Sequence, residues 1–142
     1  MPKRDRAAVN ARMEVVGDVE LERMLLRMSQ AVASELLADA LEAGAEPVVA
    51  KAKQLVPKRS GQLERSIRYE LAERSDRLSQ GDVGPASGPS EPDDGFYGFW
   101  VEFGNYGKPG TPFMSRAAEM SKDEAQKRMS DVIEKALSKA AR

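Results

Sequence analysis

The stretch FYGFWVEFGNYGKPGTPF, residues 96–113, constrains the fold more than any other part of the chain. All four phenylalanines, the only tryptophan and two of the three tyrosines lie within it. Four of these aromatic residues recur at i, i+3, i+4 and i+7, which favours a short helix over a strand. The four are Phe96, Phe99, Trp100 and Phe103. The glycines and prolines of 104–112 then predict a loop.

The aromatic residues divide into two groups by their neighbours. We expect the middle group to anchor the core, because large apolar side chains are usually buried. This group is Phe99, Trp100 and Phe103. The residues next to glycines are candidates for contacts between proteins, since rigid aromatic side chains act as anchors there. They are Phe96, Tyr97 and Tyr106.

Glu102 is the one acidic residue inside the aromatic run. A carboxylate buried among aromatic rings needs a partner, because an unpaired buried charge is costly. Candidate partners are Arg65, Arg68 and the backbone amides of the Gly104–Gly107 turn. A structural role for Glu102 is favoured over a catalytic one, since no second carboxylate, histidine or set of metal ligands accompanies it in the sequence.

The composition excludes several classes of enzyme. The chain has no cysteine and no histidine, so thiol nucleophiles, disulfides, zinc sites of the usual type and Ser-His-Asp triads are ruled out. Paired carboxylates or a Ser-Lys pair remain open, but no spacing indicates either. We therefore expect a protein that is not an enzyme and that has no catalytic residue, metal or cofactor.

Length and charge indicate one domain without a membrane or dedicated nucleic-acid role. The 142 residues carry a net charge of −1, whereas a nucleic-acid binder is usually basic. No apolar run approaches the roughly 18 residues needed to span a bilayer, and the first residues lack the apolar region of a signal peptide. We expect residues 1–17 to be a flexible arm and residues 18–142 to form a single domain. We also expect the protein to be made in the cytoplasm.

The helical pattern predicts two helices before the middle of the chain and one at its end. Apolar residues recur at three- and four-residue steps from Leu21 to Leu41, and Gly44 is placed to end that helix. Glu46-Pro47 then predicts the start of a second helix, which Pro57 ends. A last helix is expected from Phe113 to about Leu137, with a thin apolar face.

Two strands are expected between these helices. Residues 67–72 alternate apolar and polar side chains, which predicts a half-buried strand, and residues 78–83 predict a weaker partner in a hairpin. Residues 86–95 contain no large apolar residue and predict a mobile acidic loop. The expected fold class is therefore α+β: long N-terminal helices, a small antiparallel β-sheet, and a C-terminal helix packed on the sheet.

Two motifs, in this order after a helix, resemble the phage tail-component family typified by siphophage Hong Kong 97. The first is VPKRSGQLERSI at 56–67 and the second is FYGFWVEFGNYGKPGTPFMSRA at 96–117. The resemblance covers roughly residues 36–137, and the order of the motifs makes it more specific than either alone. Asn105 and Gly110-Thr111 depart from the usual pattern of the family. The residues that match the motifs are Val56, Pro57, Gly61, Leu63, Ser66, Tyr97, Val101, Glu102, Phe103, Gly104, Pro112 and Phe113.

The resemblance implies a structural virion protein at the neck or tail end of a phage. It implies a homo-oligomeric ring, hexameric in the family, that ends the tail tube and joins it to the head. Partners would be other neck and tail-tube proteins, with DNA only as passing cargo and no membrane. The protein would be made in the bacterial cytoplasm and end in the virion.

The stretch from residue 78 to residue 107 has no lysine or arginine, which raises the hypothesis of a negative ring lumen that lets DNA slide. Its candidate residues are Asp82, Glu91, Asp93 and Asp94. A second function stays open, a small nucleic-acid-binding or regulatory module. It would use the basic residues Lys3, Arg4, Arg6, Lys58 and Arg59.

Overall fold

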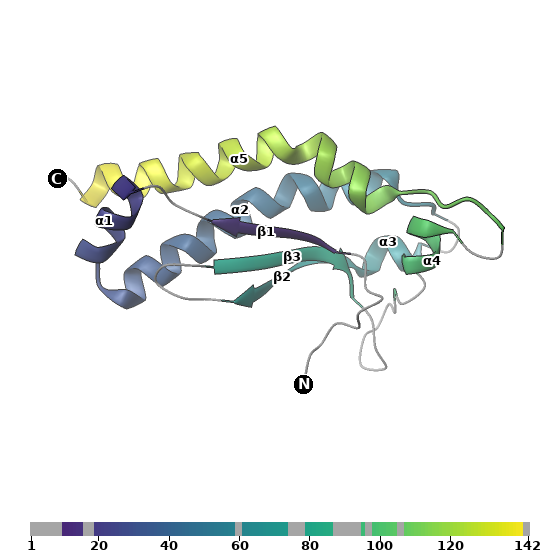
Figure 1. Cartoon of the computed structure of the whole chain (residues 1–142), viewed down its shortest axis with the longest axis horizontal. Coiled ribbons are helices and arrows are strands. Elements are labelled where there is room, and N and C mark those ends of the chain that lie inside the picture. The colour runs from purple at the N-terminus through teal and green to yellow at the C-terminus, as the bar shows by residue number, and fades with distance from the viewer. Residues whose placement is uncertain are drawn as a thin grey trace.

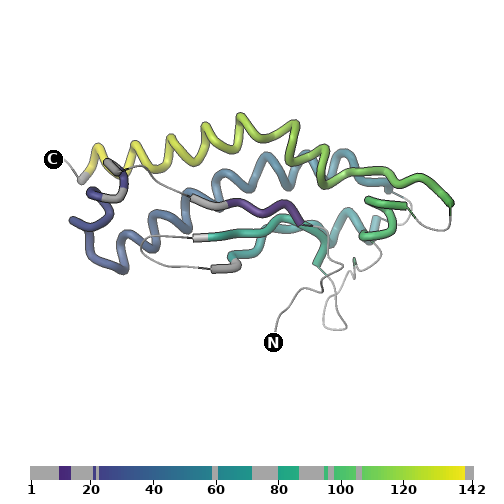
Figure 2. The backbone as a smooth tube through the Cα atoms, viewed as in Figure 1, coloured from purple at the N-terminus to yellow at the C-terminus, as the bar shows by residue number. Residues whose placement is uncertain are grey.

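The computed structural model describes residues 10–15, 19–58, 61–73, 79–86, 95, 98–104 and 107–140. Five helices and three strands lie in these residues, and Figures 1 and 2 show their arrangement in an elongated molecule. In chain order they are β1 (Ala11–Val15), α1 (Val19–Arg27), α2 (Gln30–Leu55), α3 (Gln62–Ser66), β2 (Ile67–Glu73), β3 (Ser79–Pro85), α4 (Gly98–Phe103) and α5 (Phe113–Ala140). The expected α+β class is confirmed.

The sheet has three antiparallel strands in the order β1-β3-β2. Ala11, Val83 and Tyr69 lie side by side across it, and Met13, Gly81 and Leu71 form the next row. The predicted hairpin of β2 and β3 is present, but β1 was not foreseen. The expectation of a flexible arm is wrong for residues 11–15, because they pair with β3; residues 1–9 lie outside the described part of the chain.

The long helix α2 corrects the predicted helix boundaries. The break lies at Met28–Ser29, where Ser29 accepts a hydrogen bond from the amide of Val32 (3.2 Å) and caps α2. Gly44 does not end the helix, and Pro47 lies inside it. A Cβ at Gly44 would come within 2.6 Å of the Met129 Cγ, so this glycine serves the close approach of α2 and α5.

Helix α2 lies between the sheet and α5. It contacts all three strands, and α5 runs along it and also meets β1 (Figure 1). One group of buried residues joins the second half of α2 to α3, the sheet and the start of α5. A second group joins α1 and the first half of α2, with the far end of α5 packed against it. The C-terminal helix therefore packs chiefly on α2.

Candidate functional site

The two sequence motifs meet at the end of the molecule where α3, α4 and the start of α5 lie together (Figure 1, right). Val56, Leu63 and Phe113 are buried in one apolar cluster, and Val101 of α4 packs against it. Segments about fifty positions apart in the sequence thus share one core. The residues that resemble the phage family are mostly the residues that build this end of the fold.

Glu102 is buried, with 4% of its surface exposed, and its carboxylate binds the start of α5. Its Oε1 accepts a hydrogen bond from the Met114 amide (2.8 Å), and its Oε2 accepts bonds from the Ser115 amide (3.4 Å) and the Ser115 hydroxyl (2.5 Å). The first amides of a helix have no partner within the helix, and the helix dipole favours an anion there. Glu102 therefore caps α5 from a different helix.

This geometry corrects the partners expected for Glu102. The arginines Arg65 and Arg68 and the amides of the 104–107 turn were the candidates, and α5 supplies the donors instead. Nothing in the sequence spacing marks this bond, because a loop separates Glu102 from Met114. With three donors from the first turn of α5, the carboxylate of Glu102 holds α4 and α5 together.

Two glycines let the chain fold back on α4 so that α5 can meet Glu102. Gly104 ends α4 with φ of 89°, and its amide donates to the Trp100 carbonyl oxygen (2.8 Å). A Cβ at Gly104 would lie 2.3 Å from the Lys108 carbonyl oxygen, and one at Gly110 would lie 2.3 Å from the Glu102 carbonyl oxygen. Backbone packs directly on backbone here, which only glycine permits.

Helix α4 is seated on α3 and β3 through small residues and backbone bonds. The Ala86 amide donates to the Ser66 carbonyl oxygen (2.8 Å), and the Gly95 amide donates to the Ala86 carbonyl oxygen (2.9 Å). Gly98 lies against Pro85 and Leu63, where a Cβ would meet their side chains at 3.0 and 3.3 Å. The ends of the 86–95 loop are therefore fixed; residues 87–94 lie outside the described part.

The middle aromatic residues are not in the core, so that expectation is wrong. Phe99 is 36% exposed, Trp100 45% and Phe103 65%. The buried residues of α4 are Gly98 and Glu102, and this six-residue helix has no room to bury a second face. The rings of Phe99 and Phe103 lie 5.1 Å apart at 55°. We call Phe99, Trp100 and Phe103 the aromatic patch.

The other motif residues have structural positions. Gly61 has φ of 79° and begins α3, and the buried Ser66 hydroxyl donates to the Leu63 carbonyl oxygen (2.6 Å). Pro57 is exposed and Pro112 half-buried. The candidates Phe96, Tyr97 and Tyr106 lie outside the described residues.

Of the acidic residues considered for a lumen, Asp82 is buried in the sheet. Its two carboxylate oxygens accept hydrogen bonds from Arg12 of β1 at 2.9 and 3.3 Å. Asp82 therefore binds β1 to β3, and its charge is not presented to solvent. Glu91, Asp93 and Asp94 lie outside the described residues.

The basic residues of the second candidate function are only partly described. The Lys58 ammonium donates to the Gln54 carbonyl oxygen (3.2 Å) and lies 3.7 Å from a Glu64 carboxylate oxygen. Lys58 is thus held at the end of α2. Lys3, Arg4, Arg6 and Arg59 lie outside the described part of the chain.

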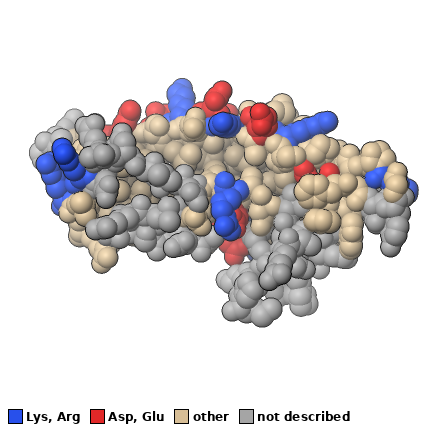
Figure 3. Space-filling model, in the orientation of Figure 1, with Lys and Arg blue, Asp and Glu red and all other residues tan. Residues whose placement is uncertain are grey.

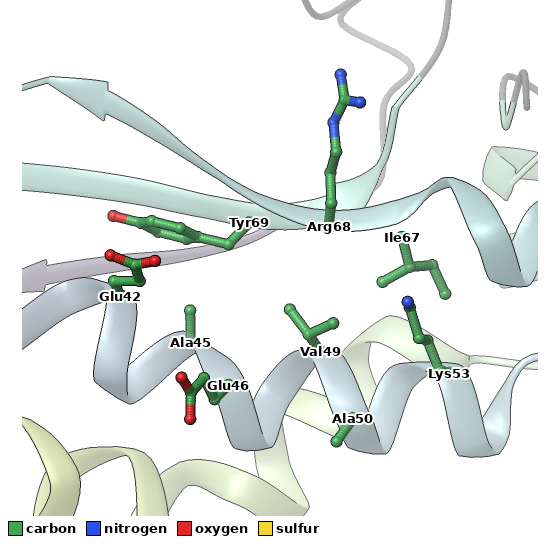
Figure 4. A pocket seen from close by; sticks show the side chains of 9 residues that line it. All are labelled: Glu42, Ala45, Glu46, Val49, Ala50, Lys53, Ile67, Arg68 and Tyr69. Carbon is green, nitrogen blue, oxygen red and sulfur yellow. The ribbon is translucent and has the colours of Figure 1, made fainter. Parts of the chain in front are cut away.

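A separate groove of about 510 Å³ follows the seam between α2 and β2 (Figure 4). Its walls are mainly apolar, from Ala45, Val49 and Ile67, and Arg68 extends away from α2. The buried Tyr69 hydroxyl has no hydrogen-bond partner within the described residues and lies beside Glu42. Burial, and then the charges of Glu42 and Asp82, raise the pKa of the Tyr69 phenol above its ordinary value of 10.0.

In the part of the chain that the structure describes, neither the motif region around α4 nor the groove beside β2 has the donors of a metal centre. Among the described residues, no group of three or more aspartate or glutamate side chains could hold a metal ion. In that same part of the chain, no helix has the length and apolar character required to cross a bilayer. What the motif region can offer chemically is a rigid, exposed aromatic surface.

Comparison with known proteins places the chain in a phage family. Residues 19–104, more than half of the chain, match the family described as "Bacteriophage HK97-gp10, putative tail-component". The chain belongs to this family of phage tail components. The match begins at α1 and ends at Gly104, so it contains the first motif and the aromatic run up to that glycine. No curated protein and no solved structure matches.

Proposed function

We propose that this protein is a structural subunit of a ring at the neck or tail end of a phage particle. The observation that carries the proposal is the aromatic patch, held on a helix whose position is fixed by the Glu102 cap and by glycine contacts. When a neighbouring subunit covers these three large aromatic side chains, the burial of their apolar surface stabilises the contact. Because the chain belongs to a family of phage tail components, we propose that this neighbour is another protein of the phage particle.

The ring would end the tail tube and join it to the head, with copies related by rotation. A ring needs two different surfaces on each subunit that meet when the rotation closes. Each contact should bury at least about 1,000 Å² in total. Six copies would follow the family resemblance. Such a subunit positions its neighbours and performs no chemistry, which agrees with the structural role of Glu102.

A negative lumen is the part of the proposal that concerns DNA. It rests on the sequence from residue 78 to residue 107, which has no lysine or arginine. Asp82 is set aside because Arg12 neutralises it, which leaves Glu91, Asp93 and Asp94. Repulsion of phosphates would let DNA pass without binding. Electron microscopy of the assembled ring tests this, and these residues on the outer wall would contradict it.

The ring itself is tested by light scattering on the protein alone and with a tail-tube protein. We expect a defined oligomer or a complex that caps the tube. A strict monomer that joins neither neck nor tube proteins would overturn the proposal. Binding to DNA that weakens steeply with salt would favour the nucleic-acid module instead.

A further inference from the structure

The aromatic patch is too small to be a whole interface. From their exposed fractions, Phe99, Trp100 and Phe103 present apolar surface on the order of 300 Å². A stable contact covers roughly 800 Å² on each partner. The patch therefore suits the centre of a larger contact, where a few aromatic residues supply most of the binding energy.

A second exposed apolar surface lies at the other end of the molecule, where α1 meets α2 (Figure 1, left). Leu26 and Val32 flank this turn, and each is more than half exposed. Arg23 and Arg27 lie one helical turn apart on α1 beside Leu26, and both are exposed. Within the described residues neither arginine forms an ion pair. We call Arg23, Leu26, Arg27 and Val32 the α1 shoulder.

The chemistry of these two surfaces is complementary. The face of an aromatic ring carries partial negative charge and attracts a guanidinium group. Arginine and aromatic residues are also the types most enriched among the energetically dominant residues of interfaces. Both arginines are exposed, so their guanidinium groups are accessible to the rings of another copy. Leu26 and Val32 can bury apolar area against the same rings.

We propose that the aromatic patch of one copy docks on the α1 shoulder of the next copy. The inference rests on the proposed function, because it names the contact from which that ring is built. The two surfaces lie at opposite ends of the molecule (Figure 1), so each copy presents one surface to each neighbour. A contact of this kind joins copies head to tail, which is what a ring requires.

A symmetric contact between two aromatic patches is the competing arrangement. It would pack the aromatic side chains of the two copies against one another, leave the α1 shoulder in water, and stop at a dimer. The two arrangements differ in one respect that can be measured, namely whether a change on the α1 shoulder affects assembly.

Sedimentation velocity of the full chain, over a range of concentrations, tests the proposal with single variants. F103S and L26S should each weaken self-association at least about tenfold, because each removes apolar surface from one side of the contact. M120S is the matched control: it removes an exposed apolar side chain of α5 outside both surfaces and should leave assembly unchanged. Circular dichroism verifies that all three fold, as expected for exposed positions.

Trp100 gives a second readout, because it is the only tryptophan in the chain. Its emission should shift to shorter wavelength as wild-type copies associate. The shift should be smaller in L26S at the same concentration, although residue 26 lies at the opposite end of the molecule. A shift in L26S equal to that in the wild type would overturn the proposal.

Mixing two blocked variants tests the direction of the contact. F103D keeps only the α1 shoulder and L26D keeps only the aromatic patch, so each alone should be monomeric and the mixture should stop at a one-to-one dimer. Assembly of L26D alone would overturn the proposal in favour of the symmetric contact. If the wild type assembles and none of these variants affects assembly, the proposed contact is wrong but the proposed ring stands. If the wild type stays monomeric both with and without tube protein, the contact and the ring are both wrong.

Discussion

At the residue scale, Glu102 links two helices that the chain separates by a loop. Its carboxylate accepts hydrogen bonds from Met114 and Ser115, so the position of α4 depends on the start of α5. These bonds hold the Glu102 side of α4 against the fold, while the neighbouring residues Phe99 and Phe103 stay exposed. Together with Gly98, this buried acid determines which side of α4 meets the fold.

Glu102→Ala should lower the free energy of unfolding by about 2–3 kcal/mol, because buried donors lose a charged acceptor. Glu102→Gln should lose less, since its carbonyl oxygen can still accept from Met114. Ser115→Ala, which removes only the hydroxyl donor, is the matched control and should cost about 1 kcal/mol. Urea unfolding measures all three. A Glu102→Ala protein as stable as the wild type would show that the cap contributes nothing.

Gly104 and Gly107 offer a comparison of two glycines with the same backbone conformation. Both have positive φ, 89° and 79°, but a Cβ at Gly104 meets the backbone of Lys108 at 2.3 Å, whereas one at Gly107 meets nothing within 4 Å. Gly107→Ala should lower the free energy of unfolding by about 1 kcal/mol, because alanine disfavours the left-handed conformation. Gly104→Ala should cost at least about 1 kcal/mol more. Equal losses in urea unfolding would contradict the close packing of this turn.

At the element scale, the contact between α2 and the sheet includes a buried polar atom that has no hydrogen-bond partner among the described residues. The Tyr69 ring lies across Gly81, and its hydroxyl is buried without a hydrogen bond within the described residues. Tyr69→Phe should therefore leave stability near pH 7 unchanged or raise it by up to about 1 kcal/mol. Urea unfolding of the two proteins at neutral pH gives the comparison.

The same phenol predicts a pH dependence. Its pKa is raised in the folded state, so folding favours the protonated form. The contribution to stability is constant below the unfolded pKa of about 10 and is lost as the pH rises through the folded pKa. Wild-type stability should thus fall more steeply above pH 10 than that of Tyr69→Phe. Parallel pH profiles of the two proteins would contradict the raised pKa.

The elements that sequence reasoning found are those with a strong local pattern. The alternation of residues 67–72 and the helical stripes of α2 and α5 survive in the structure. The boundary at Gly44 was misplaced, because this glycine serves a contact with Met129 of a distant helix. β1 was missed since its polar residues pair with β3 and include Arg12, whose carboxylate partner, Asp82, lies far along the chain.

The sequence motifs contain residues that the structure brings together, but not the geometry in which they meet. The motifs do mark the residues that meet around α4, but hydrophobicity alone placed Phe99, Trp100 and Phe103 in the core. Burial depends on which face of a six-residue helix meets the fold, and Gly98 and Glu102 determine that face. The cap on α5 could not be read from spacing, because it depends on how the Gly104–Gly110 turn brings the chain back.

At the scale of the whole molecule, a long α2–α5 pair carries different apolar surfaces at its two ends (Figures 1 and 2). Charged side chains lie along the ridge of α5 (Figure 3), which suits a face that stays in water. A molecule of this form can join copies end to end with its flank solvated. That arrangement agrees with a family of phage tail components and with a ring at the neck or tail end.

The most direct test of this account is the mass of the full-length protein in solution by light scattering, alone and with a tail-tube protein. The account predicts a single closed oligomer of several copies, or its formation on the end of the tube, and its loss in F103S but not in M120S. A protein that stays monomeric at every concentration, in both the absence and the presence of tube protein, would contradict it.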